Sequence, residues 1–153
     1  MTSSFTRSSR PRSLTEAPCR PQGGRDRFLR KSSSHEQARR SAYTDGYATW
    51  PRINKKPFST PGAHNGVKNV YTSRQRGRNR LFPNGTVIVK SIVTPGEKGR
   101  PGQVAVMRKV NGRWRWIEYT LTGRRYGVLA QGALCSACHM QVKARDWVFT
   151  RAS

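Results

Sequence analysis

Two cysteines and a histidine near the C-terminus have the spacing of a motif that attaches a cofactor. The segment Cys135-Ser136-Ala137-Cys138-His139 fits the pattern C-x-x-C-H. In this pattern the two thiols add to the vinyl groups of haem, and the adjacent imidazole reaches the iron. A single turn of helix supplies all three groups. We therefore predict one covalently bound haem c per chain, attached at Cys135 and Cys138, with His139 as the proximal ligand of the iron.

The same side chains are also zinc ligands and redox-active thiols, so two other chemistries compete with haem. A structural zinc site needs four ligands, and the chain has no second spaced pair of cysteines. Only Cys19 or His64 could complete such a site, whereas a thioredoxin-like redox pair would need the two thiols alone. Haem c is the preferred interpretation because its pattern is complete. Cys19 and His35, both isolated in a polar segment, are given no role.

The chemistry of a haem iron depends on what lies opposite the proximal histidine. Met140 is adjacent to His139 and cannot reach the other side of the ring. Met107 is a candidate ligand, but a single methionine in a predicted strand is more often a core residue. We therefore expect an open distal position, which favours small-molecule binding or redox catalysis over electron transfer alone.

Composition divides the chain into two parts and indicates acidic partners. Residues 1–42 are rich in Arg, Ser, Pro and Gly and poor in apolar residues, which predicts a disordered basic tail. Residues 43–153 are predicted to fold as one haem-binding domain. The 153 residues include 30 Lys and Arg against 7 Asp and Glu, a net charge of +23. Such a charge attracts anionic or acidic molecules.

The domain is predicted to be mainly β (α+β), with an antiparallel sheet and a C-terminal haem-bearing helix. Short runs of β-branched and aromatic residues alternate with turn signals, as is typical of strands. Asn-Gly at 111–112 is a strong hairpin signal between two such runs. The predicted strands are Val67–Ser73, Thr86–Val93, Gln103–Val110 and Arg113–Thr120. The predicted helices are Tyr43–Trp50 and Tyr126–Met140, with Asp146–Phe149 as a closing extended segment.

The alternation of side chains along a strand assigns residues to faces without saying which face meets the haem. Trp114, Trp116 and Glu118 share one face of their strand, and Ile117 and Tyr119 share the other. Either face could supply the walls of a haem pocket.

Lys90 has an unusual place in the strand Thr86–Val93, because it lies between Ile88 and Ile92 on one face. A lysine there either extends its charge to water along its apolar stem, or is desolvated and becomes nucleophilic. The residue pattern alone favours the first.

Five segments, in their order and spacing, resemble the cytochrome P-460 family over about residues 50–150. That family has a mostly β c-type haem fold, and its best-known members oxidise hydroxylamine in the periplasm. In those members a lysine in the strand after an F-P-x-G-T turn is cross-linked to the porphyrin. Lys90 occupies the matching place and is the candidate cross-linking residue. The segments are Phe82–Lys90, Val104–Lys109, Trp114–Trp116, Cys135–His139 and Asp146–Phe149.

The resemblance leaves an alternative function open. Cytochromes c′-beta share the sheet, lack the cross-link and bind nitric oxide in an apolar pocket, so a non-catalytic nitric oxide-binding protein is the alternative, beside an electron-transfer cytochrome. The hydroxylamine-oxidising members use a distal carboxylate, but the strand Gln103–Val110 has no acid, and Ala105 or Met107 would leave the pocket apolar. A proton relay must use one of the domain's few acids, of which Asp146 fits a capping role better. These acids are Asp45, Glu97, Glu118 and Asp146.

The expected partners are a small nitrogenous substrate or gas ligand and an acidic electron-acceptor cytochrome. The family resemblance also implies a homodimer. Nucleic acid is disfavoured because the arginine-rich segments lack interleaved aromatic residues. No apolar run reaches the length of a membrane span, and the N-terminus lacks the apolar region of a secretory signal. Because haem c is attached outside the inner membrane, we expect a periplasmic protein whose start is misassigned or whose export signal is missing from this sequence.

Overall fold

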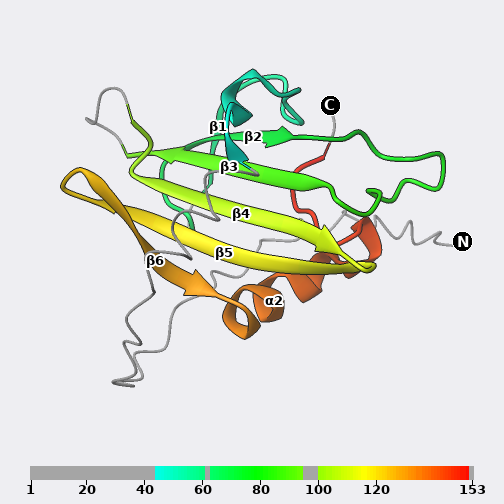
Figure 1. The fold of residues 1–153 in the computed structure, drawn as a ribbon. Helices are drawn as coiled ribbons and strands as arrows, with labels where there is room; N and C mark the ends of the chain where they lie inside the picture. The colour runs from blue at the N-terminus through cyan, green and yellow to red at the C-terminus, as the bar shows by residue number, and fades with distance from the viewer. Residues whose placement is uncertain (1–43, 61–62, 95–99, 152–153) are drawn as a thin grey trace, which may run out of the picture.

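The computed structural model describes residues 44–60, 63–94 and 100–151, and its centre is one antiparallel sheet (Figure 1). The six strands lie in sequence order, so each strand pairs with the one before it. This meander confirms the predicted mainly β fold. The strands are β1 (Phe58–Ser59), β2 (Val67–Thr72), β3 (Val87–Val93), β4 (Gln103–Val110), β5 (Arg113–Thr122) and β6 (Arg125–Gln131).

The hairpin between β4 and β5 forms where the sequence predicts it. Val110 pairs with Arg113 across the turn, whose two residues Asn111 and Gly112 have φ of 49° and 75°. Asn and Gly adopt positive φ more readily than other residues, so this turn fixes the register of both strands. Strand β3 follows the Pro-Asn-Gly turn at 83–85 and is almost entirely buried, in agreement with its dense β-branched sequence.

The predicted helix Tyr126–Met140 is wrong in its first half. Residues Arg125–Gln131 instead form β6, which pairs with β5. The outer edge of β5 carries backbone N–H and C=O groups that need hydrogen-bond partners, and pairing with these residues supplies them. Gly132, with φ 61° and ψ −121°, separates this strand from the helix. Within the predicted segment only α2 (Ala133–His139) is α-helical, and the 3-10 helix η2 (Met140–Arg145) follows it.

Two further segments differ from the prediction. In the described part of Tyr43–Trp50 the main element is a short 3-10 helix, η1 (Tyr47–Thr49), which begins after Gly46 at φ 68°. The segment Asp146–Phe149 is not extended at its start, because Asp146 and Trp147 have φ of 56° and 62° and form a left-handed turn. The predicted tail, residues 1–42, lies outside the described residues, as do Cys19, His35 and Glu97.

The two faces of the sheet pack against different segments. One face carries a buried cluster that includes Ile88, Met107 and Trp114 and extends to Val148 near the C-terminus. On this side lie α2, which contacts β5 and β6, and the C-terminal segment, orange and red in Figure 1. The other face carries a cluster that includes Val89 and Tyr119, with Tyr47 and Trp50 packed against it.

A buried carboxylate attaches the C-terminal turn to the sheet. Asp146 accepts hydrogen bonds from the backbone N of Phe82 at 2.8 Å, from Lys109 Nζ at 2.9 Å and from Trp114 Nε1 at 3.1 Å. Lys109 and Asp146 are buried together as an ion pair. These contacts agree with a structural, capping role for Asp146. No helix among the described residues is long and apolar enough to span a membrane.

Candidate haem site

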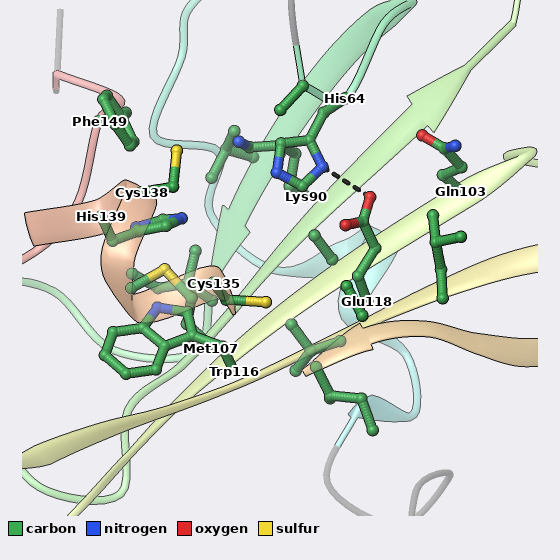
Figure 2. Close-up of a pocket in the computed structure, with 18 of the residues that line it drawn as sticks. His64, Lys90, Gln103, Met107, Trp116, Glu118, Cys135, Cys138, His139 and Phe149 are labelled. Carbon is green, nitrogen blue, oxygen red and sulfur yellow. Dashed lines mark hydrogen bonds and ion pairs between the residues drawn. The ribbon is translucent and has the colours of Figure 1, made fainter. Parts of the chain in front are cut away.

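A cavity of about 630 Å³ lies between the sheet and α2 (Figure 2). Its size is within the range of about 300–1,000 Å³ that is usual for cofactor sites. Its walls come from the sheet, α2, the loop at 63–65 and the C-terminal segment 148–150. Because Trp116 and Glu118 line it, the face of Trp114, Trp116 and Glu118 is the one that meets the cavity. The side chains of the sheet that line it include Ile88, Lys90, Ala105, Met107, Trp116 and Glu118.

The helix α2 brings Cys135, Cys138 and His139 to this cavity together. His139 Nδ1 lies 2.6 Å from the carbonyl oxygen of Trp147, so Nδ1 carries the proton and donates it. Nε2 therefore keeps its lone pair, which is the form of imidazole that binds a metal. This arrangement is compatible with the predicted role of His139 as the iron ligand.

Burial keeps the imidazole of His139 neutral. Desolvation lowers the pKa of His139 to about 4, the hydrogen bond to Trp147 opposes this shift, and Coulombic interactions with Lys90 and His64 add to it. At neutral pH the ring is consequently uncharged and competent to bind iron.

The two cysteines are partly buried and are not joined to each other. Desolvation raises the pKa of the Cys135 thiol, and the negative charge of Glu118 raises it further. Neither cysteine is in a disulfide, so both thiols can form thioether bonds to a cofactor. Figure 2 shows them on α2 at the same end of the cavity as His139.

Aromatic rings surround His139 and form the wall behind it. The ring centre of Phe149 lies 5.1 Å from that of His139, and Trp116 lies 6.0 Å away. Trp147 packs against Trp116 at 5.6 Å. These rings restrict the orientation of the imidazole and exclude water from it.

The cavity has the properties of a site for a large, mostly apolar group with polar contacts. Trp116 Nε1 and Gln103 Oε1 are buried and have no hydrogen-bond partner in the described part of the chain. Unsatisfied buried polar atoms are costly, so a bound group is expected to contact them. Leu129 and Leu134 line the cavity yet are 51% and 62% exposed, and a porphyrin would cover them. The residues present therefore fit haem.

A zinc site is not supported by the geometry. Within residues 44–60, 63–94 and 100–151, no three His, Cys, Asp or Glu side chains are grouped closely enough to hold a metal ion. His64, the described residue that could have completed a zinc site, is paired with Glu118 instead. Haem iron needs only one protein ligand from this set.

Lys90 lies on the wall of the same cavity. It belongs to β3, pairs with Val70 and Ala105 on the neighbouring strands and is half-buried. Its charge contributes to the lowered pKa of His139. The structure therefore brings Lys90, Cys135, Cys138 and His139 to one cavity.

The structure also places an acid in the cavity, at a position that the sequence left open. Glu118 is 8% exposed and pairs with His64, whose Nδ1 lies 2.7 Å from Glu118 Oε1. Glu118 lies directly opposite Ala105 on the adjacent strand, so β5 supplies the acid that β4 lacks. Figure 2 shows the pair at the end of the cavity away from α2. The sequence indicated that Glu118 shares a strand face with Trp116, but nothing in the sequence indicated that Glu118 would pair with His64.

The comparison with known protein families agrees with this geometry. A model of the family described as Cytochrome P460 matches residues 44–150. The chain belongs to the cytochrome P460 family. It is therefore a c-type haem protein of this family, and the resemblance predicted from the sequence is confirmed. Searches of curated proteins and of solved structures found no significant match.

The two methionines considered as distal ligands of this cytochrome P460 lie in different places. Met140 is 61% exposed and follows α2, whereas Met107 lines the cavity and is 8% exposed within the core cluster. The open distal position stays a prediction. Among the described residues, the other acids lie elsewhere: Asp45 is exposed before η1, and Asp146 is held by Lys109 and Trp114.

Proposed function

We propose that this cytochrome P460 carries one haem c per chain and oxidises hydroxylamine at the open iron position opposite His139. Cys135 and Cys138 would hold the haem through thioether bonds, and His139 would ligate its iron. The observation that supports catalysis best is the buried carboxylate of Glu118 in the wall of the haem cavity. Oxidation of hydroxylamine removes protons together with electrons, so a base inside the cavity is what the reaction needs.

The side chains of the cavity have separate tasks in this proposal. The bound haem supplies the electron sink, which takes electrons from the substrate and passes them to an acceptor. His139 holds the iron in an orientation fixed by its hydrogen bond to the Trp147 carbonyl. Glu118 accepts a proton from an N–H or O–H bond of the substrate. The aromatic and aliphatic walls exclude water, which strengthens these polar contacts.

Lys90 is proposed to form a covalent bond from Nζ to a porphyrin carbon, in which one N–H and one C–H bond are broken and the two electrons pass to an external oxidant such as a peroxide. Its place on β3, in the wall of the cavity that α2 closes, supports this role. Such a bond would fix the porphyrin between the sheet and α2.

The proposed electron acceptor is an acidic protein, and the charge distribution supports it. Among the acids of the described residues, Glu118 and Asp146 are buried, and Asp45 is exposed. The exposed surface of these residues is otherwise charged by Arg and Lys, which would attract an acidic acceptor. We further propose that the haem domain spans residues 43–153 behind a basic tail at 1–42, that the protein acts in the periplasm, and that it forms a homodimer.

One alternative function is favoured by a specific observation. Ile88, Ala105 and Met107 make much of the sheet wall of the cavity apolar, as expected for a protein that binds nitric oxide without turnover. Hydroxylamine would then cause no sustained reduction of an acceptor.

The proposed function is tested by mixing the purified holoprotein with hydroxylamine and an electron acceptor. Wild-type protein should reduce the acceptor continuously, and Glu118→Gln should lower kcat on the order of 100-fold. Asp45→Asn is the matched control, because it removes an exposed acid outside the cavity and should leave the rate unchanged. Absence of turnover in the wild-type protein would contradict hydroxylamine oxidation and favour the nitric oxide-binding alternative.

A further inference from the structure

His64 connects the buried carboxylate of the cavity to the surface. Its side chain is 18% exposed, that of Glu118 is 11% exposed, and Nδ1 of His64 lies 2.7 Å from Oε1 of Glu118. The neighbours of His64 in the chain, Ala63 and Asn65, are exposed. The imidazole therefore touches the cavity acid on one side and lies close to solvent on the other.

The loop that carries His64 has a backbone conformation that is fixed by its surroundings. His64 has φ 62°, in the left-handed region, which few residues other than glycine adopt. Gly66 has φ 130°, and a Cβ atom there would lie 2.6 Å from the carbonyl oxygen of Val93. Only glycine lets the loop approach the end of β3 this closely. The loop is thus held against the sheet in a conformation that presents His64 to Glu118.

Other groups of the cavity define the surroundings of the pair. Gln103 lies at the same end of the cavity in Figure 2, and its Oε1 has no hydrogen-bond partner among the described residues. The remaining titratable side chains that line the cavity are Lys90 on β3 and Cys135, Cys138 and His139 on α2. Among all side chains, histidine most readily gains and loses a proton near neutral pH. His64 is therefore suited to exchange protons between Glu118 and water.

We propose that Glu118 and His64 form a two-member proton relay between the haem cavity and solvent, an inference that rests on the proposed function. A proton leaves an N–H or O–H bond of the ligand and binds a carboxylate oxygen of Glu118. Glu118 transfers it to Nδ1 of neutral His64 in the tautomer that carries its hydrogen on Nε2, so that the product is an imidazolium paired with the Glu118 carboxylate. The imidazolium then releases a proton to water, so both side chains return to their starting charges. The ligand class is a small molecule that must lose a proton when it binds or reacts.

Hydrogen cyanide tests this relay without hydroxylamine turnover. It loses one proton when it binds ferric haem iron as cyanide, whereas nitric oxide binds without proton loss. Stopped-flow association rates of both ligands would be measured on purified ferric holoprotein as wild type, Glu118→Gln, His64→Gln and His64→Ala. Association of hydrogen cyanide should slow on the order of 100-fold in Glu118→Gln and about 10-fold in both His64 variants. Association of nitric oxide should not change, which shows that the cavity is intact.

The His64→Gln variant separates a relay from a positioning role. Glutamine can still donate a hydrogen bond to Glu118 but cannot carry a proton. If His64→Gln binds hydrogen cyanide as fast as the wild type, the relay is overturned, whether or not His64→Ala is slow. A wild-type protein that fails to oxidise hydroxylamine would contradict the proposed function, while the cyanide rates would still decide the relay.

Discussion

At the scale of single residues, the orientation of His139 depends on a turn that other residues hold in place. The carbonyl that accepts its Nδ1–H belongs to Trp147, and both Trp147 and Asp146 have left-handed backbone angles. Such angles are unfavourable for residues other than glycine and persist only where contacts impose them. The hydrogen bonds of Asp146 to Lys109 and Trp114 provide those contacts. The orientation of His139 therefore depends on a buried ion pair outside the cavity.

Asp146→Asn should destabilise the protein strongly. Lys109 and Asp146 are 8% and 7% exposed, so the substitution leaves a buried lysine without its counter-charge. We expect the free energy of unfolding in urea to fall by about 3–5 kcal/mol. Replacing both residues, as Lys109→Met with Asp146→Asn, should restore part of the loss because no unpaired charge remains. An Asp146→Asn variant as stable as Asp45→Asn would contradict the role given to this ion pair.

At the scale of elements, local sequence signals predicted the parts of the sheet whose structure is decided locally. The Asn-Gly turn and the β-branched run of β3 have their own conformational preferences, so the β4–β5 hairpin and β3 were predictable. Strand β6 was not, because its residues become a strand only by pairing with β5. The left-handed turn at Asp146 was missed for a similar reason, since distant hydrogen bonds impose it.

Gly66→Ala should disturb the loop that carries His64. The added Cβ would lie 2.6 Å from the Val93 carbonyl oxygen at a φ of 130°, so the backbone must shift. We expect a loss of about 1–3 kcal/mol in the free energy of unfolding, measured by urea denaturation. Gly127→Ala is the matched control, because its Cβ would meet no atom within 4 Å and should leave stability nearly unchanged. Equal stability of the two variants would show that the loop does not require its glycine.

At the scale of the whole molecule, the site combines residues that are far apart in the sequence. The C-x-x-C-H motif indicated that Cys135, Cys138 and His139 act together, and the structure places all three on α2 (Ala133–His139). The pair of His64 and Glu118 joins residues 54 positions apart, so no motif could reveal it. Folding also separates acids that the sequence alone does not distinguish. Glu118 and Asp146 are buried, whereas Asp45 is exposed.

The basic surface predicts how electron transfer depends on salt. Raising the ionic strength from about 0.01 M to about 0.15 M shortens the Debye length from about 30 Å to about 8 Å. The second-order rate of reduction of an acidic acceptor protein by the reduced cytochrome should therefore fall steeply over this range. An uncharged small-molecule acceptor is the control and should show little change. A rate for the acidic protein that is independent of salt would contradict attraction by this surface.

Mass spectrometry of the haem-bearing peptides tests the central claim most directly. After proteolysis of the purified holoprotein, we predict one haem attached to the peptide that contains Cys135 and Cys138 and also linked to the peptide that contains Lys90. Lys90→Arg should lose only the second link, and replacing both cysteines with alanine should abolish the thioether attachment. Haem that is extracted from the wild-type protein by acidified organic solvent, leaving both cysteines as unmodified thiols, would contradict the account.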